Sequence, residues 1–390
     1  MTPAPAAALP QAAGTQVRLG APAPGGLALP SGTPTRSQLY APRGVFLTEK
    51  VLAVADSGNH RILLWHGLPT RDGAPADAIL GQPTAESEGA NAGGRGPENG
   101  FHLPTGLAVL DGRLFVADAW HHRILVWERV PERSDAPPDW ALGQSDLRSI
   151  QPNRGGAVSA STLYWPYGLG WFDGWFYVAD TGNRRVLAWR GLPEKDRPAD
   201  AVLGQPDFHA SDENRAGPAS PRSFRWPHAI VGVGGYLYVA DAGDHRVLGW
   251  QGDPWDSNGD RDADLALGQP DLRSANELPY APQCASTLRF PYALATDGYG
   301  LAVADTANNR VLFWNRVPTD SGAPADRVIG QANFAGNGEN RWQAVRQDTL
   351  CWPYGISLFD GRLAIADSGN NRVMIWTLPA EAGLVRRGTG

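Results

Sequence analysis

Hydrophobic residues along this chain occur in short runs that turn-forming residues separate. In one stretch of the chain the runs cover residues 106–110, 114–117, 123–127 and 140–143. They are rich in Leu, Val, Ile, Phe and Trp, and Asp, Gly and Pro occur between them. Short β-prone runs bounded by such residues are typical of antiparallel strands. The pattern therefore predicts four strands, which we call a, b, c and d in chain order.

The same four-strand pattern recurs with a period of about 62 residues. Strand b of each copy ends in Val-Ala-Asp or Ile-Ala-Asp, with the aspartates at Asp56, Asp118, Asp180, Asp241, Asp305 and Asp367. An arginine follows each aspartate five residues later, and a tryptophan follows each arginine after four more. A twisted four-stranded sheet cannot bury both faces alone, so the copies must pack face to face around an axis. The repeat predicts an all-β fold, a six-bladed β-propeller with four antiparallel strands per blade.

The sixth copy lacks its strand d, because no Leu-Gly-Gln segment follows Trp376. A similar segment stands near the other end of the chain, where residues 17–22 align with Val202, Leu203, Gly204, Gln205 and Pro206. We therefore expect an N-terminal strand at 16–20 to complete the last blade and remove an exposed sheet edge. The predicted propeller covers 16–378, with a disordered tail at 1–15 and a C-terminal tail at 379–390.

Composition supports this interpretation and excludes some classes of protein. A chain of 390 residues would ordinarily suggest more than one domain, but the repeat overrides that expectation. The formal net charge of -6 opposes non-specific attraction to phosphate backbones. The N-terminus does not resemble a secretory signal and no apolar run is long enough to span a bilayer, so we expect a cytoplasmic protein. Cys284 and Cys351 are either free thiols or one incidental bridge.

Three copies carry a motif that resembles the NHL repeat. The motif is Asp-Ser-Gly-Asn-His-Arg-Ile-Leu at 56–63, and it recurs with small changes at 180–187 and 367–374, each time after a Pro-x-Gly strand. The resemblance extends over about 39–376 and implies a six-bladed propeller. The units are longer than usual, and with their Gly-Gln-Pro-Asp step they resemble stand-alone bacterial NHL proteins. NHL propellers include RNA binders, protein-interaction platforms and a zinc-dependent peptidyl-hydroxyglycine lyase, so the resemblance implies little about activity.

Motifs that recur in every blade indicate architecture rather than function. The Asp and Arg of each copy are five residues apart across the b–c turn, where a charge-assisted hydrogen bond would lock the turn. The strand c tryptophans are expected to pack between neighbouring sheets. A Gly-Gln step ends strand d in five copies and is interpreted as a turn device, with its glutamines at Gln82, Gln144, Gln205, Gln269 and Gln331.

Three histidines offer a possible zinc site, because His60, His122 and His245 come from three different blades. They occupy the ordinary histidine position of the repeat motif, beside the locking arginine. The structural interpretation is therefore preferred, and no metal ligands are assigned. No set of three histidines falls at the start of strand a, which disfavours the lyase activity.

The strongest candidates for binding lie where strand a begins. In an antiparallel blade the b–c turns and the d–a loops share one face. On that face, the residue after the proline that opens strand a varies between copies, and we expect it to ring the mouth of the central channel: Arg43, Thr105, Tyr167, His228, Tyr292 and Tyr354. Aromatic residues precede several of these prolines, among them Trp165, Trp226 and Trp352, and Trp120 lies nearby. These ten residues are the predicted binding site, although for the tryptophans the filling of gaps between blades is the preferred interpretation.

A possible calcium loop lies on the opposite face. Asp256, Asn258, Asp260, Asp262 and Asp264 alternate as in part of a calcium-binding loop. The usual glycine is replaced by Arg261, and Leu267 stands where a glutamate is expected. A solvated acidic loop is therefore the preferred interpretation, and no cofactor is assigned.

Three functions are compatible with this sequence. A non-catalytic binding scaffold for a partner protein or peptide is the first, because variable loops on a rigid disc suffice for it. An enzyme acting on a small molecule or peptide at the channel mouth is the second, but the mouth offers no Asp or Glu for a metal cage or a carboxylate pair. Binding of single-stranded RNA is the third, through the aromatic rings with Arg43, Arg225 and Arg289. No catalytic residue is assigned.

Overall fold

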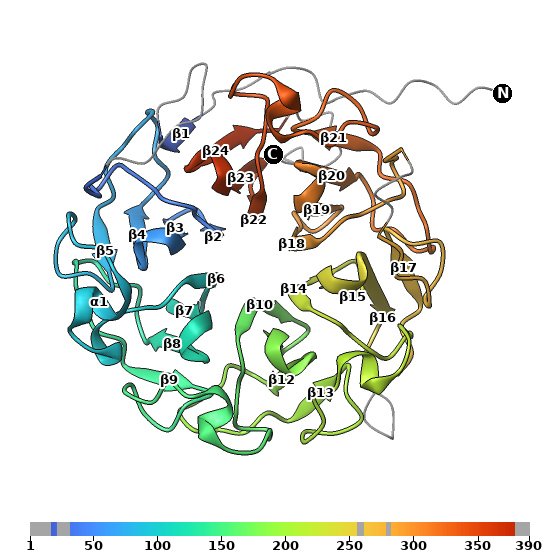
Figure 1. Cartoon of the computed structure of the whole chain (residues 1–390), viewed down its shortest axis with the longest axis horizontal. Helices are drawn as coiled ribbons and strands as arrows, with labels where there is room; N and C mark the ends of the chain where they lie inside the picture. Colours follow the sequence, from blue (N-terminus) through green and yellow to red (C-terminus); the bar gives the residue numbers. More distant parts are fainter. Residues whose placement is uncertain (1–16, 22–31, 256–260, 278–281, 379–390) are drawn as a thin grey trace, which may run out of the picture.

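The computed structural model describes residues 17–21, 32–255, 261–277 and 282–378. Within these residues, six four-stranded antiparallel sheets surround a central channel as the blades of a propeller (Figure 1). The predicted fold is confirmed. No helix in the described segments is both long and apolar enough to cross a bilayer.

Each blade runs from an inner strand a to an outer strand d. Blade 1 has β2 (Gly44–Leu47), β3 (Val51–Asp56), β4 (Arg61–His66) and β5 (Ala78–Leu80). Blade 2 has β6 (Pro104–Leu110), β7 (Arg113–Asp118), β8 (Arg123–Trp127) and β9 (Trp140–Leu142). Blade 3 has β10 (Pro166–Phe172), β11 (Trp175–Asp180), β12 (Arg185–Arg190) and β13 (Ala201–Leu203).

The second half of the ring repeats this order. Blade 4 has β14 (Pro227–Val233), β15 (Tyr236–Asp241), β16 (Arg246–Gln251) and β17 (Leu265–Leu267). Blade 5 has β18 (Pro291–Ala295), β19 (Leu301–Asp305), β20 (Arg310–Trp314) and β21 (Arg327–Ile329). Blade 6 has β22 (Pro353–Phe359), β23 (Arg362–Asp367) and β24 (Arg372–Thr377), with β1 (Val17–Gly20) as its outer strand.

The predicted closure by the N-terminal strand is confirmed. β1 pairs antiparallel with β24, with Val17 opposite Ile375 and Leu19 opposite Val373. The side chains of Val17 and Leu19 are buried in the apolar layer between blades 6 and 1. Strand β1 thus joins the two ends of the ring. The predicted tails at 1–15 and 379–390 lie outside the described residues.

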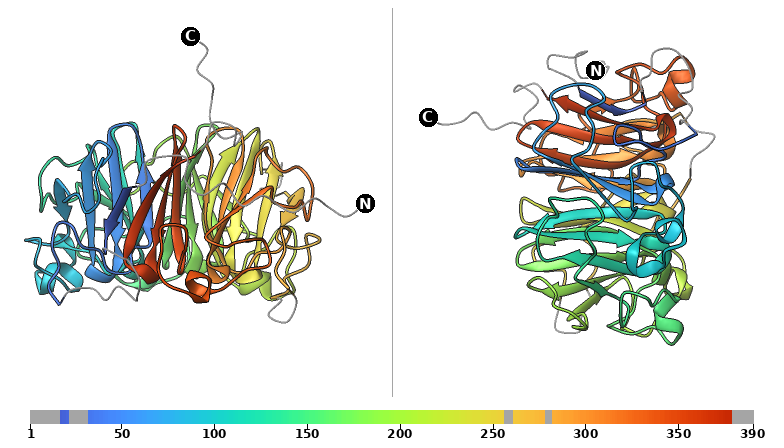
Figure 2. Two further views of the ribbon diagram at one scale, coloured as in Figure 1. Left: turned by 90° about the horizontal axis from the view of Figure 1, so that it is seen from above. Right: turned by 90° about the vertical axis from the view of Figure 1, so that its left-hand side faces the viewer.

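Short helical turns connect the strands on one face of the disc (Figure 2). The b–c turns contain η1 (Ser57–Asn59), η3 (Ala119–His121), η5 (Thr181–Asn183), η7 (Ala242–Asp244), η8 (Thr306–Asn308) and η10 (Ser368–Asn370). The d–a loops contain α1 (Ala90–Gly94), η2 (Pro97–Asn99), η4 (Pro152–Gly155), η6 (Glu213–Ala216) and η9 (Glu339–Trp342). Gln82 Nε2 donates to the carbonyls of Asn59 and Gly89 and so joins a b–c turn to a d–a loop. The two kinds of loop share one face, as predicted.

The Asp–Arg pair of each blade is a buried structural lock. In all six blades the arginine Nε lies 2.6–3.2 Å from an aspartate Oδ2, and both side chains are inaccessible to solvent. In blade 3, Arg185 also donates to the carbonyls of Ser159 and Thr162, and Asp180 Oδ1 accepts the Tyr164 amide. Each pair therefore fixes the b–c turn and also the loop that leads into strand a.

The strand c tryptophans occupy the spaces between blades. They are buried, and the indole of Trp189 contacts Phe176 while its Nε1 donates to the carbonyl of Arg197 in the following loop. Equivalent indole bonds occur in blades 1, 2, 4 and 5. The structural interpretation of the Asp, Arg, Trp and Gln positions agrees with these contacts.

The glycine of the Pro-x-Gly step allows the inner strands to approach one another. A Cβ atom at Gly44 would lie 1.8 Å from the Thr105 carbonyl oxygen, and one at Gly168 would lie 2.1 Å from that of His228. Neither distance is possible for a real side chain, so any larger residue would force neighbouring blades apart. These glycines therefore determine how closely the inner strands approach one another, and thus the width of the channel beside Arg43 and Tyr167.

Candidate functional site

A backbone irregularity places the predicted ring residues at the channel. In blades 2 to 6 the pairing of strands a and b shifts register just after the opening proline, for example between Pro166 and Leu169. Such bulges change the direction of a side chain relative to the regular alternation of a strand. In blades 3 to 6 the residue after the proline is directed toward the axis rather than into the layer between blades, whereas Thr105 in blade 2 is not.

Five of the six ring residues meet at the axis. Tyr167 contacts His228 and Tyr292, with ring centroids 4.3 and 5.7 Å apart, and His228 lies 4.4 Å from Tyr292. Tyr292 contacts Tyr354 at 4.8 Å, and the Arg43 guanidinium lies 5.1 Å from the Tyr354 ring. These five side chains, together with strand a backbones from all six blades, line a cavity of about 80 Å³ in the channel.

The five residues differ in their exposure to solvent. His228 is only 1% exposed and Tyr167 only 4%, because the rings pack against one another across the axis. Tyr292, Tyr354 and Arg43 are half-buried. The channel is therefore narrowed by contacting side chains.

Thr105 does not belong to this group. Its side chain is buried, and its hydroxyl donates to the Tyr167 carbonyl at 3.1 Å. It does not line the cavity. Thr105 thus connects the inner strands of blades 2 and 3 and lies apart from the other predicted ring residues.

A continuous band of aromatic contacts leads from the axis onto the face. Trp165 lies 6.2 Å from His228 and 6.5 Å from Trp120, and Trp120 contacts His102 at 5.6 Å. On the other side, Trp352 stacks on Tyr354 at 6.5 Å. We call this set the aromatic band: His102, Trp120, Trp165, Tyr167, His228, Tyr292, Tyr354 and Trp352. Its outer members are accessible, with Trp120 48% and Trp352 38% exposed.

Trp226 lies apart from the band. It stacks on Phe290 at 6.2 Å and lies under the Arg225 guanidinium. Arg225 forms an ion pair with Glu213 at 3.0 Å, and Arg289 forms one with Glu277 at 2.7 Å. Two of the three arginines proposed for phosphate contacts are thus already paired with carboxylates, which weakens the RNA interpretation.

Burial sets the ionisation of the groups at the axis. Burial is the main reason why the pKa of His228 is lowered to about 4. The hydrogen bond to the Trp226 carbonyl raises this pKa, and the positive charge of Arg43 lowers it. Burial also raises the pKa of Tyr292 to about 12 and that of Tyr167 well above its ordinary value. Near neutral pH the imidazole and the phenols are uncharged. Of the described residues that line the cavity, Arg43 is then the one that carries a charge.

Two buried polar atoms at the axis lack a partner among the described residues. They are the Tyr167 hydroxyl and His228 Nε2. His228 Nδ1 lies 2.8 Å from the Trp226 carbonyl, so Nδ1 carries the hydrogen and Nε2 offers a lone pair. Buried polar atoms in folded proteins usually have a hydrogen-bond partner, so these two atoms are available to a bound water molecule or small ligand.

The three histidines considered for zinc have another role. The Nδ1 atoms of His60, His122 and His245 accept backbone amides of the next blade, from Leu103, Trp165 and Phe290, at 3.1–3.2 Å. In blades 5 and 6 the Oδ1 atoms of Asn309 and Asn371 do the same. These side chains join neighbouring blades. In the described part of the chain, no three His, Cys, Asp or Glu side chains gather as a metal site would require.

These histidines predict a pH dependence of stability. Burial lowers the pKa of His60 and His122 to about 4, whereas the unfolded chain titrates near 6.5. The stabilisation is therefore complete above pH 6.5 and is lost as the pH falls toward 4, because the unfolded chain takes up protons first. We expect a loss of about 1 kcal/mol per histidine between pH 6.5 and 5, allowing for partial exposure. Urea unfolding at a series of pH values measures it.

The variant His60→Asn/His122→Asn is the matched test, since blades 5 and 6 already use asparagine at this position. Its free energy of unfolding should match the wild type near pH 7 and fall less steeply below pH 6.5. Equal slopes in the two proteins would show that these histidines do not cause the pH dependence.

The proposed calcium loop is described only in part. Residues 256–260 lie outside the described residues. Of the remainder, Asp262 pairs with Arg222, and Asp264 pairs with Arg261 and accepts the Gln251 amide. Both described carboxylates thus already have cationic partners, which agrees with the interpretation as an acidic surface loop.

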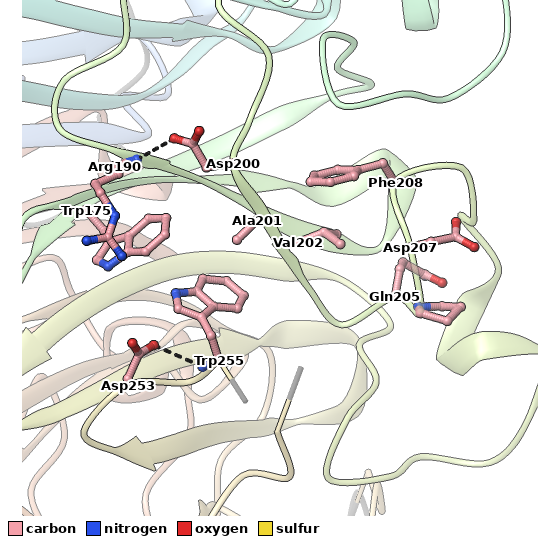
Figure 3. Close-up of a pocket in the computed structure, with 11 residues that line it drawn as sticks. Trp175, Arg190, Asp200, Ala201, Val202, Gln205, Asp207, Phe208, Asp253 and Trp255 are labelled. Atoms are coloured by element: carbon pink, nitrogen blue, oxygen red, sulfur yellow. Dashed lines mark hydrogen bonds between the residues drawn. The ribbon is translucent and has the colours of Figure 1, made fainter. Parts of the chain in front are cut away.

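A larger hollow of about 450 Å³ lies at the outer surface between blades 3 and 4 (Figure 3). Trp175 and Trp255 form its walls with ring centroids 5.6 Å apart, and the Arg190 guanidinium lies over Trp175. The Arg190 and Trp255 amides donate to Asp200 and Asp253. These two carboxylates thus serve the local backbone, while Gln205 Oε1 and Trp255 Nε1, which also line the hollow, have no partner among the described residues.

Sequence reasoning missed His102 and the two exposed tyrosines at the equivalent repeat position, Tyr40 and Tyr164. His102 stands two residues before the strand a proline, at the position of Tyr40 and Tyr164 in blades 1 and 3. Tyr40 and Tyr164 are exposed. The amide of this residue donates to the locking aspartate in every blade. Aligning the six copies at this position would have identified these aromatic residues from the sequence.

The described geometry defines the protein as a six-bladed β-propeller with an aromatic band across its channel. Residues 101–127 match the model of the NHL repeat. This match falls in blade 2, and the other five copies share the Asp, Arg and Trp positions of the matched one.

Several solved structures are similar in fold. A streptogramin B lyase has 12% identity and a TM-score of 0.43, with 90% of this chain and 96% of that chain covered. Virginiamycin B lyase from Staphylococcus aureus has 12% identity and a TM-score of 0.44, with 89% and 98% covered. The WD40 propeller domain of Doa1 has 12% identity and a TM-score of 0.44, with 90% and 99% covered. Similarities this low say nothing about function. No curated protein sequence matches this chain.

Proposed function

We propose that this protein is a binding scaffold that recognises an extended peptide or loop of a partner protein through the aromatic band. The observation that carries the proposal is the continuity of the band. Its rings contact one another from Trp120 to Trp352 across the channel, and the two outer tryptophans are exposed. Exposed aromatic side chains on a rigid support are the usual centres of binding energy in interfaces.

The geometry supports binding better than proton transfer. His228 is the imidazole nearest the axis, but its pKa of about 4 makes Nε2 a weak base near neutral pH. Its Nδ1 hydrogen is directed at the Trp226 carbonyl rather than at a carboxylate. The Cys351 thiol is buried, which raises its pKa to about 12 and makes it a poor nucleophile.

The variant Trp120→Ala/Trp352→Ala tests the proposal. Peptides selected from a random display library against the wild-type protein should bind the variant about 30-fold more weakly, as expected when interface tryptophans are truncated. Isothermal titration with the selected peptides measures the change. Thermal unfolding should be nearly unaffected, because both side chains are accessible to solvent.

Trp342→Ala is the matched control. Trp342 is 78% exposed in η9 and does not contact the band. Peptide affinity should therefore stay within about twofold of the wild type. The proposal is wrong if no peptide is selected, or if the band and control variants bind equally well.

A further inference from the structure

The cavity at the axis has the features of a small-ligand site. It is lined by Arg43, Tyr167, His228, Tyr292, Tyr354 and neighbouring residues of the inner strands. Its volume is about 80 Å³, well above the roughly 10–15 Å³ that a single water molecule needs. A ligand of only a few non-hydrogen atoms, or one end of a longer ligand, fits this space.

The Arg43 guanidinium requires an anionic partner. It stacks on Tyr354, and no side-chain ion pair or hydrogen bond links it to another described residue. No Asp or Glu is among the described residues that line the cavity. A half-buried guanidinium without a counter-ion is a ready partner for a carboxylate, which it can bind through two parallel hydrogen bonds.

The two unpartnered buried atoms specify the rest of the ligand. His228 Nε2 offers a lone pair and therefore needs an O–H or N–H donor. The Tyr167 hydroxyl can donate to a carboxylate oxygen. The charge of Arg43 affects the pKa of both Tyr167 and His228. The guanidinium, the Tyr167 hydroxyl and His228 Nε2 therefore lie close together.

We propose that this cavity binds a carboxylate that carries a hydrogen-bond donor on its adjacent carbon. Arg43 holds the carboxylate, Tyr167 donates to it, and His228 Nε2 accepts the hydrogen of the neighbouring hydroxyl or amide. Two sources supply this chemistry: a free hydroxy acid, and the C-terminal residue of a peptide, whose own amide stands beside its carboxylate. The inference goes beyond the proposed peptide binding by the exposed tryptophans, and the two are tested with different ligands and variants.

Titration calorimetry with four small probes tests the chemistry. Glycolate represents the free hydroxy acid and N-acetylglycine the peptide end, while acetate lacks the donor and N-acetylglycinamide lacks the carboxylate. We expect glycolate, N-acetylglycine or both to bind with a dissociation constant in the millimolar range or lower. Their affinity should exceed that of acetate about fivefold or more, and N-acetylglycinamide should not bind. Which of the first two binds better identifies the source.

Three variants assign the contacts. Arg43→Met should weaken binding of the preferred probe at least tenfold, and Arg43→Lys should weaken it less. Arg225→Gln is the matched control, because Arg225 pairs with Glu213 outside the cavity, and it should bind normally. His228→Gln should abolish the preference over acetate. If His228→Gln does not fold, the inference is still tested by two measurements. They are the preference of the wild-type protein for glycolate or N-acetylglycine over acetate, and the affinities of the two Arg43 variants.

The inference is overturned by any of three results. The first is that none of the carboxylates binds at up to ~20 mM, well above the expected range. The second is that acetate binds as tightly as glycolate and N-acetylglycine. The third is that Arg43→Met binds the preferred probe as well as the wild type does.

Discussion

Arg185→Met is expected to lower the free energy of unfolding by about 3–5 kcal/mol, among the largest effects of any single substitution in this protein. Arg185 is inaccessible to solvent, and its guanidinium donates to Asp180 and to the carbonyls of Ser159, Thr162 and Phe208. Methionine fills similar space but donates nothing. The variant therefore leaves a buried carboxylate without its cation and three carbonyls without a donor. Urea unfolding followed by tryptophan fluorescence measures the loss.

Two further variants separate the charge pair from general packing. Asp180→Asn combined with Arg185→Met should recover part of the loss, because no uncompensated charge remains. Arg148→Met should change stability by less than about 0.5 kcal/mol, since the Arg148 side chain is 80% exposed. If Arg185→Met were as stable as Arg148→Met, the pair would not be the lock that its repetition in every blade indicates.

The fold was predictable because its determinants are local and repeated. Asp180 and Arg185 are five residues apart, and the same spacing occurs six times, so the b–c turn and the number of blades follow from the sequence. The closing strand was predictable for a different reason. The sixth copy lacks one strand, and residues 17–20 are the segment that resembles it.

The ring residues were predictable in position but not in exposure. The register placed Tyr167 and His228 at the start of strand a, and the structure brings them to the axis. Their burial depends on side chains of other blades, more than 60 residues away in sequence, and no local pattern reports that packing. Thr105 shows the same limit, because its short side chain bonds to the Tyr167 carbonyl instead of reaching the axis.

The histidines show why residue type alone was a poor guide to chemistry. His60 occupies the position that asparagine fills in blades 5 and 6, and both side chains accept an amide of the next blade. The relevant property is a lone pair at a certain distance from the backbone, which a histidine and an asparagine share. Arg184, which occupies this position in blade 3, has no such lone pair. There the Trp226 amide donates to Asp241 instead.

Removal of residues 1–21 is expected to lower the free energy of unfolding at least as much as the loss of an Asp–Arg lock does, because it deletes β1. The truncation removes the side chains of Val17 and Leu19 from the layer between blades 6 and 1 and leaves β24 with an unpaired edge. It also removes the bonds that Arg18 donates to Asp72 and the bond that its carbonyl accepts from the Gly73 amide, which join β1 to blade 1. Burial of one Val and one Leu side chain contributes about 3–6 kcal/mol, and the lost pairing adds to this. Thermal unfolding should therefore shift strongly downward.

Light scattering after gel filtration provides the second measurement. An exposed β24 edge is a template for pairing with another chain, so the truncated protein should form dimers or larger assemblies at concentrations where the wild type does not. Removal of residues 1–14 is the matched control, since it retains β1, and both its unfolding temperature and its mass in solution should match the wild type.

A synthetic peptide spanning 15–22 should restore part of the stability of the longer truncation, because the groove left between β24 and blade 1 matches it in register and in apolar contacts. If the longer truncation unfolded at the wild-type temperature as a monomer, blade 6 would be stable with three strands, and β1 would not be what holds the ring closed.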